Sequence, residues 1–154
     1  MKLLQYLFFT FLMLGATQTY ANQSKLTLVD GDTNIELSIE SLRQEASTTF
    51  TFFSPFKQRN LEVKGLLLEE LFQKHLSKVP KKIKLVAIDG YEVLLSNWQK
   101  KHWLIVTHED GQPISIRQRG PLRLIERKYK NKNPKNLRDF NDWIWMLQRI
   151  EVVQ

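Results

Sequence analysis

The side chains of this chain that could do chemistry are carboxylates, arginines and histidines, because the sequence contains no cysteine. The missing cysteine excludes catalytic thiols, cysteine-based zinc sites and iron–sulfur clusters. The three histidines are scattered and lack the spacing of a zinc site, so we expect no metal centre. Neither a nucleophile elbow nor a phosphate loop is present. Asp89 and Glu109 stay open as an acid–base pair, but only the general abundance of carboxylates favours that role.

The elements that would position these side chains follow from hydrophobic periodicity, which predicts mixed α and β structure with many strands. Leucines at helical spacing follow Gly65 and predict one prominent helix, which ends before Pro80. Asp-Gly pairs between short alternating segments predict hairpin turns. Strands or extended segments are expected at Lys25–Val29, Asn34–Ser38, Thr48–Phe53, Ile83–Ile88, Tyr91–Leu95, Trp103–Thr107, Ile114–Ile116, Leu122–Ile125 and Ile150–Val153, short helices at Ile39–Glu45 and Asn97–Lys101, and loops at Phe56–Asn60 and Lys128–Asn136.

The first 21 residues differ from the rest of the chain. Lys2 precedes an apolar run from Leu3 to Gly15, and Thr19-Tyr20-Ala21 places small residues where a signal peptidase cuts. The run is shorter than the roughly 20 residues that a membrane span needs. We therefore expect a cleaved signal peptide at residues 1–21, one domain at residues 22–154, and a mature protein that does not span the membrane.

Positive charge is concentrated in one part of the chain. The net charge is +7, and Arg117–Arg138 alone holds nine basic residues and one acid, Glu126, which gives +8. A basic stripe suggests nucleic acid, but the export signal argues against that partner. A solvated loop, an anionic ligand, an acidic partner and a membrane surface stay open.

Several motifs occur in an order that resembles a known family. VKGLLLEEL is followed by VAIDGYEVLL, LIVTHEDGQPI, RGPLRLIER and WIWMLQRIEV. This order resembles the oxidoreductase molybdopterin-binding domain, which has the sulfite-oxidase fold, over roughly Thr48 to Val153. Each motif is weak alone. The resemblance implies an α+β domain built on a single mixed sheet.

The chain departs from the family where the metal would bind. In the molybdenum enzymes a cysteine lies about a dozen residues before the glycine that opens the helix, and its thiolate ligates the metal. Counting back from Gly65 leads to Phe53 and Ser54, and neither side chain can replace a thiolate. The chain instead resembles short exported members that lack the cysteine, some of which are periplasmic pterin-binding regulators of membrane enzymes that make or degrade cyclic di-GMP.

The resemblance implies a reduced pterin as ligand rather than a catalytic cofactor. A carboxylate can pair with the donors of the aminopyrimidone edge, an arginine can meet its carbonyl, and aromatic rings can cover its faces. Besides the six candidates named next, Glu109 is a further carboxylate, Arg123 is a further donor, and Trp98 and Phe56 are further rings. The candidate ligand-binding residues are Phe53, Ser54, Asp89, Tyr91, Arg119 and Trp143.

Each candidate also has an ordinary structural interpretation. Asp89 before Gly90 is typical of a turn, and Ser54 before Pro55 is typical of a strand end. Arg119 could be solvated, and Tyr91 could cover the core. Arg123 could pair with Glu126 or with a backbone carbonyl. Trp143 and Trp145 alternate, so only one of them is expected to face the core.

Three functions stay open at this point. The first is a non-catalytic periplasmic pterin-binding protein that signals to the periplasmic part of an inner-membrane cyclic di-GMP cyclase or phosphodiesterase, with Arg127–Arg138 as the contact. The second is a molybdopterin-dependent oxidoreductase or subunit without the cysteine ligand. The third is an adaptor whose pocket is filled by side chains such as Phe53.

Overall fold

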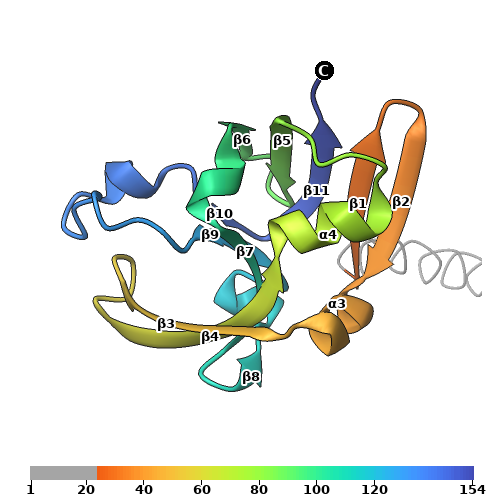
Figure 1. Ribbon diagram of the computed structural model, residues 1–154. Coiled ribbons are helices and arrows are strands. Elements are labelled where there is room, and N and C mark those ends of the chain that lie inside the picture. Colours follow the sequence, from red (N-terminus) through yellow and green to blue (C-terminus); the bar gives the residue numbers. More distant parts are fainter. Residues whose placement is uncertain (1–23) are drawn as a thin grey trace, which may run out of the picture.

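The computed structural model describes residues 24–154, which form two β-sheets, two α-helices and three short 3-10 helices (Figure 1). The expected signal peptide at residues 1–21 lies outside the described residues. Within residues 24–154 no helix is long and apolar enough to cross a membrane. The domain is therefore α+β, as the periodicity predicts.

The strands and helices alternate irregularly along the chain. The strands are β1 (Lys25–Asp30), β2 (Thr33–Ser38), β3 (Thr48–Ser54), β4 (Arg59–Leu67), β5 (Lys82–Ala87), β6 (Glu92–Ser96), β7 (Trp103–Glu109), β8 (Gln112–Pro113), β9 (Arg123–Glu126), β10 (Ile144–Trp145) and β11 (Leu147–Val152). The α-helices are α3 (Ile39–Glu45) and α4 (Leu68–His75), and the 3-10 helices are η2 (Trp98–Lys101), η3 (Ile116–Gln118) and η4 (Leu137–Phe140).

The first sheet has the strand order β2-β1-β11-β5-β6 and is mixed. Strand β1 runs parallel to β11, with Leu28 opposite Ile150, whereas the other neighbours are antiparallel. Leu26, Leu28 and Ile150 are fully buried because alternate residues of these strands face the core. The hairpin of β1 and β2 confirms the prediction made from the Asp30-Gly31 turn.

The second sheet has the order β10-β9-β7-β4-β3, with β8 paired to β7, and all its pairs are antiparallel. The expectation of a single mixed sheet is therefore wrong. The chain passes from β10 to β11, and so from one sheet to the other, at Met146, whose φ is 55°. The Met146 carbonyl accepts a hydrogen bond from the Ile88 N–H at 2.9 Å. Periodicity places strands but does not say which of them share a sheet.

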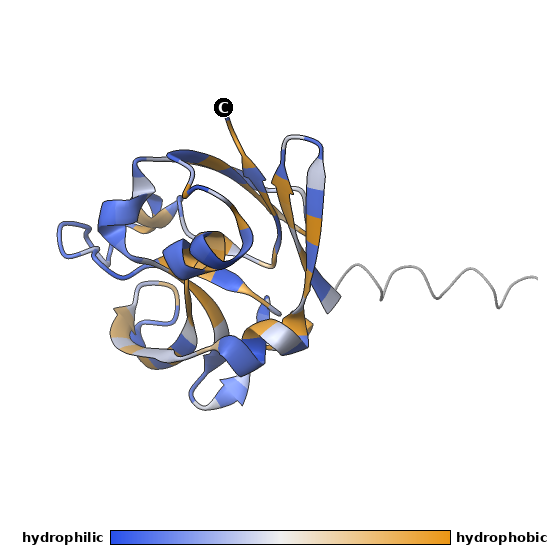
Figure 2. Cartoon of the chain, turned by 45° about the vertical axis from the view of Figure 1, so that its right-hand side comes forward, coloured by the Kyte–Doolittle hydropathy of each residue, from blue (hydrophilic) through white to orange (hydrophobic). Residues whose placement is uncertain are grey.

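The two helices form as their sequences predict. Ser38 caps α3, since its Oγ accepts a hydrogen bond from the Ser41 N–H at 3.0 Å. Helix α4 buries Leu68, Leu71 and Phe72, and it contacts β4 and β7. Figure 2 shows how hydrophobic and hydrophilic residues are distributed over residues 24–154. Hydrophobic positions alternate along the strands, and hydrophilic positions follow one another along the loop after β9.

The region of β4 differs most from the structure that the sequence predicts. Phe56–Asn60 was expected to be a loop and Gly65 to open a helix, but the strand begins at Arg59 and includes Gly65. Leu61 and Val63 are buried at alternate positions, which is a strand pattern. Gly65 stands beside β7 at a register shift, where a Cβ atom would overlap the carbonyl oxygen of Ile105. The glycine is required by this close approach of two strands and not by a helix start.

The alternation of Ile114 and Ile116 was a second error. Ile114 is buried, but Ile116 is exposed and begins the short helix η3. The Gln118 side chain accepts a hydrogen bond from the Ser115 N–H at 3.1 Å and so closes the turn. This local polar bonding overrides the hydrophobic pattern and places Arg117 and Arg119 on one exposed turn.

Candidate functional site

A cleft of about 390 Å³ opens between η3 and the turn that follows β3. Ser54 is the last residue of β3, Phe56 lies in the turn that follows it, and Arg119 caps the end of η3. Trp145 enters from β10 at the point where the chain changes sheets. The full lining consists of Ser54, Phe56, Lys57, Arg117, Gln118, Arg119, Arg123 and Trp145.

Arg123 forms the floor of this cleft. Its guanidinium stacks over the Trp145 ring at 4.7 Å from the ring centroid, and it donates hydrogen bonds to Glu109 Oε2 at 2.5 Å and to the Gln118 carbonyl. The backbone partner confirms one of the two predicted options, whereas the carboxylate partner is Glu109 rather than Glu126. Burial lowers the pKa of the Arg123 guanidinium, and the Glu109 carboxylate opposes that shift. The arginine is thus held in place by bonds on two sides.

The cleft carries a surplus of positive charge. Lys57, Arg59 and Arg123 all approach the single carboxylate of Glu109. Arg117 and Arg119 line the mouth, and neither of them makes an ion pair with any residue of the 24–154 region. Unpaired guanidinium groups beside an aromatic ring suit a flat ligand with carbonyl or anionic groups.

A second cavity of about 350 Å³ adjoins the first, since Phe56 and Trp145 line both. Its other walls come from Asp89, Tyr91, Phe140, Asn141 and Trp143. The Phe56 ring lies edge-on to Trp145 at a centroid distance of 4.9 Å, and Phe140 meets Trp143 at the same distance. Aromatic faces and one carboxylate therefore surround this space.

Asp89 has a structural bond in addition to its place in this wall. Its Oδ1 accepts a hydrogen bond from the Tyr91 N–H at 3.1 Å, which is the turn role that Asp-Gly predicts. The Tyr91 hydroxyl donates to the Asn141 carbonyl at 2.8 Å and ties the turn to the segment before β10. A carboxylate has lone pairs for several donors, so one backbone bond leaves Asp89 able to accept from a ligand.

Comparison with solved structures reveals a shared fold. The crystal structure of the sulfane dehydrogenase SoxCD from Paracoccus pantotrophus matches with a TM-score of 0.61. The match covers 85% of this chain at 15% identity, and it covers 38% of the dehydrogenase chain. No family model matches the chain, and no curated protein matches it. This likeness shows a distant sulfite-oxidase-like arrangement and says nothing of activity.

The structure brings most of the predicted site residues together. Ser54 and Arg119 line the first cavity, while Asp89, Tyr91 and Trp143 line the second. Ser54 is 2% exposed, and its Oγ accepts a hydrogen bond from the Lys57 N–H at 3.2 Å. Both interpretations of Ser54 therefore hold, because it ends β3 and also faces the cleft.

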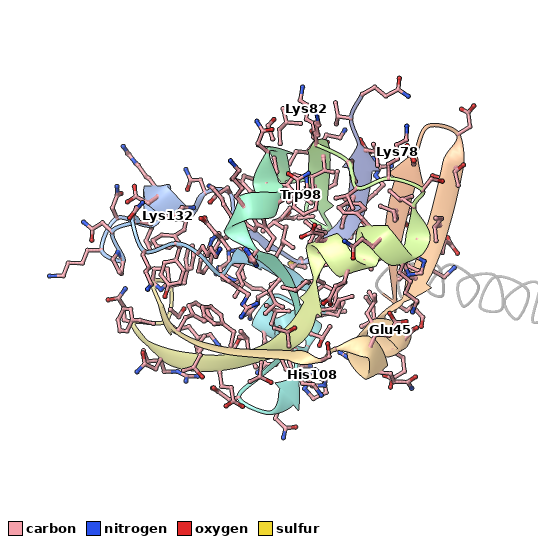
Figure 3. The ribbon with its side chains drawn as sticks, in the orientation of Figure 1. Glu45, Lys78, Lys82, Trp98, His108 and Lys132 are labelled. Atoms are coloured by element: carbon pink, nitrogen blue, oxygen red, sulfur yellow. The ribbon has the colours of Figure 1, made fainter. Side chains whose placement is uncertain are left out.

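Phe53 and Trp98 line neither of the two cavities. Residues of β3 alternate between the two faces of the sheet, so Phe52 and Ser54 point inward while Phe53 is 39% exposed and lines neither cavity. Trp98 is buried against Phe72 with ring centroids 5.4 Å apart (Figure 3). The count back from Gly65 led to both Phe53 and Ser54, and such a count cannot separate adjacent residues on opposite faces of a strand.

Sequence reasoning missed three lining residues of the first cavity, Lys57, Arg117 and Gln118, and two of the second, Phe140 and Asn141. They lie on turns or short 3-10 helices whose conformation no periodicity reports. The sequence did not decide which of Trp143 and Trp145 faces the core. Trp143 is 2% exposed and forms part of the core beside the second cavity. Trp145 is half-buried and lines both cavities. The alternation of the two tryptophans was the signal that separated them.

The molybdenum centre of the resembled family finds no matching donors here. The chain has no thiolate, and the hydroxyl at Ser54 is engaged as an acceptor for a backbone N–H. A hydroxyl stays protonated near neutral pH and is a hard donor, unlike the soft thiolate. Among residues 24–154 no group of three or more histidine, aspartate or glutamate side chains is arranged to hold a metal ion.

Proposed function

We propose that this chain is a non-catalytic, exported pterin-binding protein with a sulfite-oxidase-like fold. It binds a reduced pterin in the periplasm and presents the bound state to the periplasmic part of an inner-membrane enzyme that makes or degrades cyclic di-GMP. The observation that carries the ligand class is the pair of adjoining cavities that share Phe56 and Trp145. One offers a carboxylate among aromatic rings, and the other offers unpaired arginines.

The geometry suggests how the ligand would lie. The donor-bearing edge of the pterin faces Asp89, and its rings lie against Trp143 and Trp145. The remaining polar part of the ligand reaches Arg119 and Arg117 in the neighbouring cleft. Neither cavity is filled by Phe53, which argues against an adaptor with a closed pocket.

A molybdopterin-dependent oxidoreductase is the second candidate, and the fold shared with a dehydrogenase is the observation that favours it. The chain would hold such a cofactor through its pterin alone, because Ser54 replaces the expected thiolate. The two candidates differ in what the purified protein carries. A stoichiometric pterin without molybdenum supports the binding protein, whereas molybdenum with molybdopterin overturns it in favour of the oxidoreductase.

The site itself is tested by titration with a reduced pterin under anaerobic conditions, followed by tryptophan fluorescence. Asp89→Asn keeps the turn bond and removes the charge, and Arg119→Gln removes the free guanidinium. Each is expected to weaken binding roughly 10- to 100-fold, because a hydrogen bond to a charged group contributes about 1.5–3 kcal/mol. Glu92→Gln and Arg149→Gln change exposed charges that line neither cavity and serve as controls. Unchanged affinity in both site variants would refute the assignment.

A further inference from the structure

Three segments that are distant in sequence lie side by side on one part of the surface: the segment between α4 and β5, the helix η2, and the loop that follows β9. The Lys81 carbonyl accepts a hydrogen bond from the Asn97 N–H at 2.9 Å, which joins the first segment to η2. The Lys128 N–H donates to the Lys101 carbonyl at 3.2 Å, which joins η2 to the loop. Figure 3 labels Lys78 and Lys82 in the upper part of the view and Lys132 on the loop at the left.

These segments carry lysines that no acid neutralises. We call them the basic surface and define it as Lys78, Lys81, Lys82, Lys100, Lys128, Lys130, Lys135 and Arg138. Apart from half-buried Lys82, all of them are exposed. Within residues 24–154 none of them takes part in an ion pair. The basic surface is therefore wider than the Arg127–Arg138 loop that the sequence indicated.

Several lysines elsewhere on the domain are paired with acids. Lys25 pairs with Glu36 at 2.5 Å, and Lys74 pairs with Glu45 at 2.8 Å. Lys84 lies 2.7 Å from Glu151. Pairing of this kind lowers the local potential, so the unpaired basic residues of the basic surface leave an excess of positive charge there.

Two acids near the basic surface lie beneath it and are already neutralised, and a third, Asp139 next to Arg138, accepts hydrogen bonds from the Asn133 N–H and the Asn136 side chain. Glu126 is buried and Asp142 is half-buried, and Lys132 pairs with each of them at 2.7 Å. Lys101 approaches the same two carboxylates at 3.7 and 3.8 Å. These two lysines anchor the loop, whereas the lysines of the basic surface stay available to an external partner.

We propose that the basic surface attaches the protein to an anionic lipid membrane. Lysine dominates the surface, and lysine is a mobile, hydrated point charge that suits diffuse attraction to headgroups rather than a fixed fork geometry. Lysine is also depleted from packed protein–protein interfaces, where arginine and aromatic residues are enriched. Leu137 is 46% exposed between Lys135 and Arg138 and supplies an apolar contact for the headgroup region.

Nucleic acid fits this surface less well. Single strands are held by aromatic side chains on which bases stack. The half-buried ring of Tyr129, between Lys128 and Lys130, instead packs edge-on against Trp143 and near Phe140. The exposed rings Phe56 and Tyr91 line the second cavity instead. The proposed membrane contact goes beyond pterin binding and does not depend on it, since it uses other residues.

The test is sedimentation of the chain from Asn22, which holds the whole described fold, with phosphatidylcholine vesicles that contain about 30% phosphatidylglycerol. The variant Lys100→Gln, Lys128→Gln, Lys130→Gln removes three charges from the basic surface. The matched control Lys25→Gln, Lys64→Gln, Lys74→Gln removes three charges elsewhere. Each basic residue near a membrane contributes roughly 1 kcal/mol, so the first variant is expected to lose about a hundredfold in affinity and the control less than threefold.

The outcomes separate the possible partners. Binding to anionic but not to pure phosphatidylcholine vesicles, lost in the first variant only, supports the proposal. An equal loss in both variants overturns it, because net charge rather than this surface would then govern binding. Failure to bind anionic vesicles also overturns it, as does tighter binding to polyglutamate or to an oligonucleotide at the same ionic strength. Circular dichroism and thermal unfolding check that both variants are folded.

Discussion

Arg123 Nη1 and Glu109 Oε2 lie 2.5 Å apart in a pair whose side chains are only 6% and 10% exposed. Arg123 belongs to β9 and Glu109 to the end of β7, so the pair joins neighbouring strands at the base of the cleft. It also holds the guanidinium over the Trp145 ring, with Cζ 4.7 Å from the ring centroid. The stability of this corner of the domain and the shape of the candidate site therefore depend on the same two side chains.

Glu109→Gln is expected to lower the free energy of unfolding by roughly 3 kcal/mol, because removing one partner leaves a buried charge without its counterion. Urea unfolding followed by circular dichroism measures the change. The control is Glu151→Gln, which breaks the more exposed pair with Lys84 and is expected to cost about 1 kcal/mol or less. Equal losses in the two variants would show that the Arg123–Glu109 pair contributes no more to the free energy of unfolding than an exposed pair does.

Local sequence signals were sufficient for much of this fold. The Asp30-Gly31 hairpin, the Ser38 cap and helix α4 all depend on residues close together in the chain, and all three were confirmed. Gly65 shows where such signals end. Its requirement comes from Ile105 on β7, which is distant in sequence, so a glycine before a leucine-rich run was read as a helix start.

For the candidate site, too, local sequence signals predict single residues but not the contacts between distant segments. Asp89 and Arg119 could be named because they lie at turns within recognisable motifs, and the structure places both in cavity walls. Their separation into two adjoining cavities, with Phe56 and Trp145 between them, is a tertiary feature. The basic surface is likewise tertiary, since hydrogen bonds such as that from Asn97 to Lys81 gather its segments.

Phe56 and Phe53 offer a matched pair for testing the aromatic walls. The two rings are almost equally exposed, at 37% and 39%, but only Phe56 lines the cavities. Phe56→Ser is expected to raise the dissociation constant for a reduced pterin about tenfold or more, since stacking contributes roughly 1–3 kcal/mol per ring. Phe53→Ser is expected to leave it unchanged. Isothermal titration under anaerobic conditions measures both, and a similar loss in each variant would contradict the site.

Lys132 is expected to anchor the loop that follows β9, although its sequence context is that of a solvated lysine. Its Nζ lies 2.7 Å from Glu126 and from Asp142, and its side chain is 16% exposed. Lys132→Gln leaves Glu126 buried without this counterion and should lower the free energy of unfolding by roughly 2–4 kcal/mol. Limited proteolysis should then cut the loop faster.

Lys130→Gln is the control for the anchor, because Lys130 is exposed and lies outside every ion pair of the described residues. It is expected to change the free energy of unfolding by less than about 0.5 kcal/mol. Equal proteolysis of the two variants would mean that the loop is held by its aromatic contacts instead. Tyr129 packs edge-on against Trp143 at a centroid distance of 5.6 Å and would be the first residue to substitute in that case.

His108 should give the domain a pH-dependent stability. Burial lowers the pKa of its imidazole below the usual 6.5, and the nearby charges of Lys64 and Arg43 lower it further. The unfolded chain therefore binds more protons than the folded one between the lowered pKa and about 6.5, so stability is present above that window and is lost as the pH falls through it. Urea unfolding between about pH 7.5 and pH 5.5 should show this loss. His108→Gln should flatten the dependence while His102→Gln, at an exposed position, retains it; a slope that survives His108→Gln would assign the effect to other groups.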